Sequence, residues 1–129
     1  MATEAPNLWP DDLTEEISEA SPFAILKDQA AQLYKATQYK LRGRVSRTPG
    51  PYTHGFSYEF AIEVPKLEYA YDLFWLVQKQ LDFYPLEWRF EAESGEIASE
   101  NELYAWLKWV FSSDKTRLVV KRLIAQANA

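Results

Sequence analysis

The chain has 129 residues, of which 47% are apolar and 16% aromatic, so it is long and apolar enough to bury one core. It has no Cys and a single His, which excludes disulfides, thiolate metal sites and multi-histidine metal centres. The net charge of −5 weighs against non-specific binding to nucleic acid. We expect a single domain over 1–129.

No secretory leader or membrane span is expected. The N-terminus lacks the basic and apolar regions of a signal peptide, and the longest aliphatic or aromatic run has five residues, against about 20 for a spanning helix. The composition therefore predicts a soluble, cytoplasmic protein that does not associate with membranes.

The N-terminal region is acidic, because residues 1–20 contain six acids and no Lys or Arg. We expect residues 1–10 to be flexible. After them, Asp11 or Asp12 is placed to cap a short helix that ends at Ile17.

A second helix start follows at Ser21 and Pro22, since Ser is a favoured N-cap and Pro a favoured first residue. Apolar residues then recur at helical spacing, with Lys and Gln on the other faces. The pattern predicts an amphipathic helix over 22–38.

The apolar period then changes from helical to alternating. Alternation predicts strands over 40–48, 56–64 and 86–92, the last of them ended by Ser94 and Gly95. In the strand 56–64, one face is apolar and should lie against the helices, namely Phe56, Tyr58, Phe60 and Ile62. The opposite face carries Glu59 and Glu63, for which Arg42 and Arg44 are cross-strand partners.

The segment 67–77 admits either a strand or a helix, and its Tyr, Phe, Trp and Val content favours a strand. Strict alternation would put Phe74 and Leu76 on the outer, polar face of the sheet. Two large apolar side chains there need a cover, from a terminal segment or from another chain. We favour an interaction or self-association surface formed by Phe74, Leu76, Arg42 and Arg44.

Two helices close the chain. Ser99 and Glu102 form a capping box, and Ser113 caps a final helix that runs to about residue 127. The predicted fold class is α+β: N-terminal helices, a four-stranded antiparallel meander, and C-terminal helices packed on one face.

Few residues suggest catalysis. His54 lies in a Gly/Pro loop, where a general base is possible but a solvated side chain is the simpler interpretation. A carboxylate pair for catalysis or an oxygen-ligand metal site is one interpretation of Glu59, Glu63 and the other strand acids. Their alternation with apolar residues is instead typical of the solvent-exposed face of a sheet. We expect no catalytic residue, no metal site and no cofactor.

Charge is segregated along the chain. Residues 1–20 carry −6, residues 21–55 carry +5, residues 56–114 carry −8 and residues 115–129 carry +4. Binding of single-stranded nucleic acid is one interpretation of the basic cluster formed by Lys40, Arg42, Arg44 and Arg47. The negative net charge of the chain weighs against nucleic-acid binding. Such blocks can instead pair within one molecule or with a second copy.

Several short stretches resemble a family of small uncharacterised bacterial proteins. They are the run Pro22–Ala30, the stretch Leu81–Pro85 before the fourth strand, and Ser112–Thr116 before the closing helix. The resemblance extends over most of 22–127. It implies an α+β domain of bacterial origin and transfers no activity or site residue.

The function expected from these patterns is that of a non-enzymatic protein-interaction domain, such as an immunity-type or chaperone-like protein, whose partner is another protein or a second copy. The alternative is a small-molecule-binding domain that uses the aromatic face of the sheet. Trp and Tyr side chains are suited to line a ligand pocket as well as to fill a core.

Overall fold

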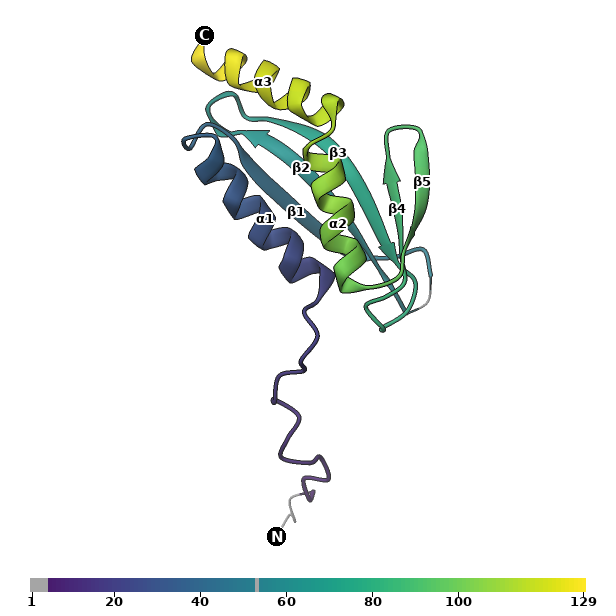
Figure 1. Ribbon diagram of the computed structural model, residues 1–129. Helices are drawn as coiled ribbons and strands as arrows, with labels where there is room; N and C mark the ends of the chain where they lie inside the picture. Colours follow the sequence, from purple (N-terminus) through teal and green to yellow (C-terminus); the bar gives the residue numbers. More distant parts are fainter. Residues whose placement is uncertain (1–4, 53) are drawn as a thin grey trace.

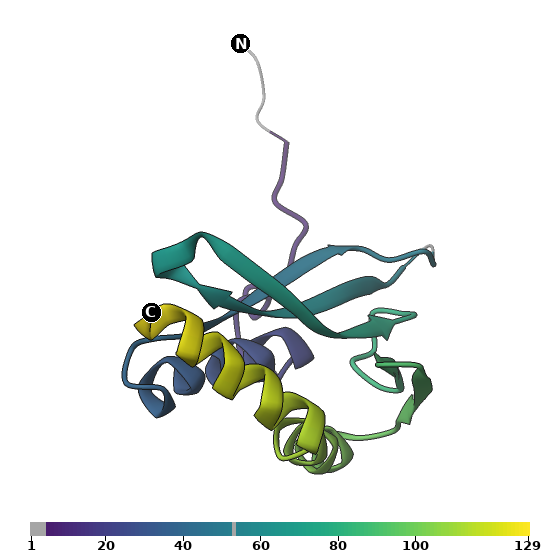
Figure 2. The same ribbon diagram turned by 90° about the horizontal axis from the view of Figure 1, so that it is seen from above.

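The computed structural model describes residues 5–52 and 54–129, and it confirms an α+β fold. One helix, α1 (Pro22–Ala36), comes before the sheet, and two helices, α2 (Glu100–Phe111) and α3 (Asp114–Asn128), come after it. The antiparallel sheet has the order β1-β2-β3-β4-β5, which is the meander order. Its strands are β1 (Arg42–Pro49), β2 (Phe56–Val64), β3 (Tyr69–Gln78), β4 (Leu86–Phe90) and β5 (Glu93–Ile97). All three helices lie on one face of the sheet, and the other face is open (Figures 1 and 2).

Residues 5–20 form an exposed arm that projects from the start of α1 (Figure 1). The expected helix from Asp11 or Asp12 to Ile17 is wrong, because the segment has only a turn, in which the Glu15 amide donates to the Asp12 carbonyl at 3.1 Å. A helix this short is not stable unless it packs on something. Of the residues expected to be flexible, 1–4 lie outside the described part.

Three of the expected helix starts, at Ser21, Ser99 and Ser113, are confirmed. The Ser21 hydroxyl accepts from the Ala24 amide at 3.1 Å, the Ser99 hydroxyl from the Glu102 amide at 3.2 Å, and the Ser113 hydroxyl from the Thr116 amide at 3.2 Å. These side chains satisfy amides that have no partner within their own helix.

The sheet has five strands, so the expected count of four is wrong. The sequence pattern ends the fourth strand at Ser94 and Gly95, but Glu93–Ile97 pairs with β4 as β5, and the turn lies earlier, at Glu91 with φ 56°. Gly95 disfavours a strand by composition. It is required here because a Cβ at this position would lie 2.6 Å from Nε1 of Trp88 on β4.

The expected orientation of β2 is confirmed. Tyr58, Phe60 and Ile62 are at most 3% exposed and face the helices, and Phe56 packs at the border of the same core. Phe60 stacks on Phe74 of β3 with ring centroids 5.1 Å apart. The core therefore lies between the sheet and the helices.

The segment 67–77 is mainly strand, but the expected parity of its second half is wrong. Phe60 pairs with Phe74, whereas the next residue, Ala61, pairs with Asp72, so Leu73 is the extra residue of a β-bulge. Leu73 and Phe74 consequently both point to the core, and alternation resumes shifted by one. Phe74 and Leu76 are fully buried, and Trp75 is 41% exposed on the outer face. Phe74 and Leu76 therefore do not form an exposed interaction surface.

We expect Phe74→Ala to lower the free energy of unfolding by about 3–5 kcal/mol, because it removes a buried ring and leaves a cavity. Trp75→Ala on the same strand is the matched control and should cost less than about 1 kcal/mol, since that indole is partly solvated. Urea unfolding measures both. A Phe74 variant of unchanged stability but altered oligomeric state would instead restore Phe74 to an interface.

Candidate functional site

A groove runs along the free edge of the sheet, between α1 and β1. β1 is the first strand in the sheet order and pairs with β2 on one side, and among the described residues no strand pairs with its other edge. The groove has a volume of about 560 Å³. We call it the α1/β1 groove and define it by the residues that line it: Lys27, Ala30, Ala31, Tyr34, Lys35, Tyr39, Arg42, Gly43, Arg44 and Val45.

Small residues set the depth of this groove. A Cβ built on Gly43 of β1 would lie 2.5 Å from Cβ and 2.6 Å from Cα of Ala30 on α1, so the helix and strand backbones touch at this point. Ala30, Ala31 and Gly43 leave the strand edge uncovered by bulky side chains. An extended segment could therefore approach the backbone of β1.

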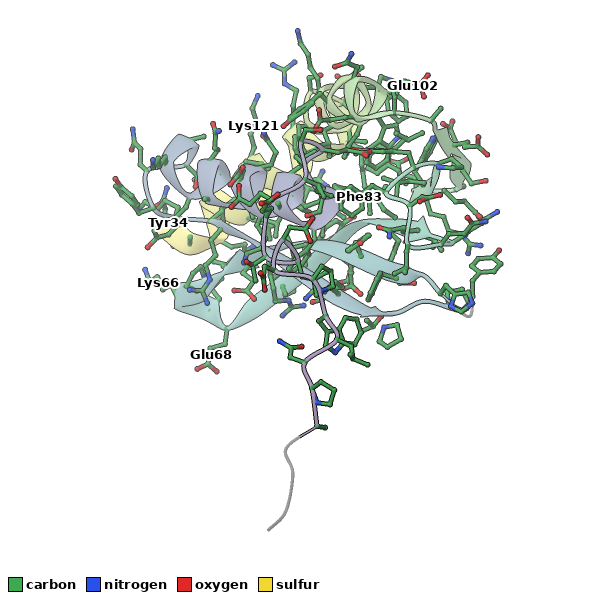
Figure 3. All side chains as sticks on the ribbon, turned by 90° about the horizontal axis from the view of Figure 1, so that it is seen from below. Tyr34, Lys66, Glu68, Phe83, Glu102 and Lys121 are labelled. Atoms are coloured by element: carbon green, nitrogen blue, oxygen red, sulfur yellow. The ribbon has the colours of Figure 1, made fainter. Side chains whose placement is uncertain are left out.

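Two tyrosines close one end of the groove, where the chain turns from α1 into β1. Thr37 holds this turn, because its hydroxyl donates to the Leu33 carbonyl at 2.9 Å and accepts from the Leu41 amide at 3.1 Å. The Tyr34 and Tyr39 rings meet edge to face, with centroids 5.0 Å apart. Figure 3 shows Tyr34 at this end of the molecule.

The lining of the groove is positively charged, with four cations and no carboxylate. Arg42 and Arg44 share one acid, Glu63, at 2.7 and 3.2 Å, and remain 56% and 47% exposed. Lys27 and Lys35 form no ion pair with the described residues. Arg47, also on β1, lies on the opposite face from Arg42 and Arg44, and its guanidinium lies 4.4 Å from the centroid of the Phe23 ring of α1.

The outer face of the sheet beyond Arg44 has the opposite character. The Trp75 indole donates to the Glu59 carboxylate at 3.2 Å. The Asp72 side chain hydrogen-bonds to Glu59 and, together with partial burial and repulsion between the two acids, raises the pKa of Glu59. The surface charge of the sheet therefore changes from basic at the β1 edge to acidic around Glu59.

A separate cleft of about 240 Å³ lies on the helical side, between α1 and α3. Its floor is the inner face of the sheet, with Phe60, Ile62 and Leu73, and its walls include Leu33 and Val120. The cleft is mainly apolar and is smaller than most pockets that enclose a drug-sized ligand, which start near 300 Å³.

The structure brings together part of the surface expected from the sequence. Arg42 and Arg44 line the α1/β1 groove, whereas Phe74 and Leu76 lie in the core. Arg42 and Arg44 pair with Glu63, as expected, but Glu59 pairs with Trp75 instead. His54 is exposed in the β1–β2 turn and takes part in neither the groove nor the cleft.

Sequence reasoning missed the α1 side of the groove. Lys27, Ala31, Tyr34 and Lys35 recur at spacings of three and four, which place them on one helix face. The spacing of these residues indicates a shared helix face, but nothing in the sequence says that this face borders a strand edge.

Two further features bear on the kind of site. Within 5–52 and 54–129, no group of three or more His, Asp or Glu side chains is arranged to hold a metal ion. Among the same residues, no helix has the length and apolar character needed to span a membrane.

We expect Gly43→Ala to destabilise the protein by about 1–3 kcal/mol, because the added methyl group would force α1 away from β1. Thr48→Ala, at an exposed position of the same strand, is the control and should cost less than about 0.5 kcal/mol. Thermal unfolding followed by circular dichroism measures both. Equal melting temperatures for the two variants would contradict the close approach of helix and strand.

Comparisons with known proteins give no relative for this chain: no family model, no curated protein and no solved structure matches it. Three features characterise the groove, namely a free strand edge, a close helix–strand contact and a row of cations.

Proposed function

We propose that this chain is a non-enzymatic protein-interaction domain that binds an acidic, extended segment of a partner protein along the free edge of β1. The α1/β1 groove carries this proposal, because its lining combines four cations with no carboxylate. The charge of +5 over residues 21–55, in a chain of net charge −5, adds to the local contrast.

The proposed binding mode is addition of a strand to the sheet. An edge strand presents unpaired amide and carbonyl groups, and an extended peptide can pair with them. Ala31 presents only a methyl group to the groove, while Lys27, Lys35 and Arg44 lie where they attract acidic side chains of the peptide. Backbone pairing would supply affinity, and the charges would select acidic over basic sequences.

We expect a short peptide of alternating valine and glutamate to bind the full chain, and the matched valine–lysine peptide not to bind. Fluorescence anisotropy of the labelled peptides measures this.

Replacing Lys27 and Lys35 together by Gln should weaken binding about tenfold, because two favourable charge contacts are removed. Raising the salt concentration should weaken it as well, since salt screens exposed charges.

The matched control replaces Lys115 and Lys121 of α3 by Gln, which removes the same charge away from the groove. Figure 3 shows Lys121 on the helical side of the molecule. This control should leave peptide affinity within about twofold. Equal binding of both peptides, or equal loss of affinity in both double variants, would refute the proposal.

The apolar cleft between α1 and α3 supports a second candidate, a domain that binds a small apolar molecule against the sheet. Here Phe60 provides an aromatic ring and Ile62 an aliphatic side chain on the sheet side of the cleft, and Val120 of α3 lies on the helical side. The volume of about 240 Å³ limits the ligand to a small one.

Toluene, which is neutral and apolar, is a suitable probe for this second candidate, because it has no charge that the basic groove would attract. If the cleft binds ligands, toluene should shift the methyl NMR signals of Ile62 and Val120 in a saturable way and leave that of Val45, in the groove, unchanged. Unsaturable or uniform shifts would exclude the cleft as a binding site.

A further inference from the structure

We infer that the N-terminal arm, residues 5–20, is an internal ligand of the α1/β1 groove and competes there with the partner segment. This inference rests on the proposed function of the groove and adds a way to regulate it. In the structure the arm projects freely on the open side of the sheet (Figure 2), so the structure represents the released state.

Charge complementarity is the first argument. The described arm carries five acids and no Lys or Arg, namely Asp11, Asp12, Glu15, Glu16 and Glu19. Residues 21–55, which form α1, β1 and the turn after β1, carry +5. The two oppositely charged blocks are consecutive in the chain, and the basic block lines the groove.

The arm is also attached at a suitable place. It ends at Ser21, the N-cap of α1, and the Phe23 ring lies under Arg47 near the C-terminal end of β1. From Arg47 back to Arg42 is about 17 Å at 3.3 Å per residue. Residues 11–20 span about 33 Å when extended, so the arm can cover the whole edge.

The direction of the arm fits strand addition. Laid back along the groove from Ser21, the arm runs parallel to β1, and α1 becomes the connection between two parallel strands. Parallel neighbours need such a long crossover, usually a helix. Pro6 and Pro10 lie towards the start of the arm, and residues 11–20 contain no proline that would interrupt pairing.

Burial of exposed apolar side chains also favours docking of the arm in the groove. Trp9, Leu13 and Ile17 are 74%, 60% and 68% exposed in the released state. In an extended arm Leu13 and Ile17 share one face and can contact the floor at Ala31 and Val45. The tether adds an effective concentration in the millimolar range, so even weak contacts would fill the groove.

The absence of Cys allows a direct test, because Thr14→Cys creates a single site for a nitroxide spin label on the full chain. Docking should broaden the amide NMR signals of Arg42–Val45 far more than those of β4. Mixing spin-labelled chains with isotope-labelled, spin-free chains separates docking within one molecule from docking onto a second copy.

The key variant neutralises four arm acids: Asp11→Asn, Asp12→Asn, Glu15→Gln and Glu16→Gln. It should abolish the broadening and raise the affinity for the valine–glutamate peptide several-fold, because the competitor is released. The matched control changes Glu68, Glu91, Glu93 and Glu96 to Gln, all exposed and outside the groove, and should alter neither result. Glu68 projects away from the helices (Figure 3).

The outcomes separate the two proposals. Peptide binding without broadening, and without an effect of the arm variant, would overturn the internal ligand and leave the proposed function intact. Broadening that persists in the mixed sample, where the observed chains carry no spin label, would overturn it too, because the arm would then occupy another molecule. If the chain with its native arm acids shows no broadening, and neither it nor the arm variant binds the peptide, both proposals fail.

Discussion

The contact between Ala30 of α1 and Gly43 of β1 is the constraint on which the functional surface depends. A Cβ at Gly43 would overlap Ala30, so the helix lies directly against the edge strand. Because α1 is this close, its Lys27 and Lys35 border the same groove as Arg42 and Arg44. A bulkier pair would separate helix and strand, and the four cations would no longer surround one edge.

The β-bulge at Leu73 has a comparable effect on the core. It lets Leu73 and Phe74 point to the same side, so that Phe74 stacks on Phe60 at 5.1 Å and meets Trp106 of α2 edge to face at 4.8 Å. The outer face is left with Trp75 among polar residues. One inserted residue thus completes the core and removes a large apolar patch from the surface.

Electrostatics divides the molecule into regions with different binding preferences. The β1 edge and the adjacent side of α1 are basic, while Glu59 and Asp72 lie close enough on the open face to raise the pKa of Glu59. The arm is acidic and exposed. The surface charge therefore changes from basic at the sheet edge to acidic around Glu59 on the open face.

The amino-acid sequence is sufficient to predict the helix starts at Ser21, Ser99 and Ser113, the inward face of β2 and the α+β class, because caps and hydrophobic periodicity are local properties. It could not determine the bulge at Leu73, since Leu73-Phe74-Trp75-Leu76-Val77 is apolar at every position and its parity depends on the Phe60 ring opposite. It also missed β5, where Gly95 lies in a strand because the Trp88 indole covers it. Arg42 and Arg44 were recognised as surface residues from alternation. Arg42 and Arg44 lie beside Lys27 and Lys35 because α1 packs against the edge strand β1, and this contact is a property of the tertiary structure that local sequence patterns do not contain.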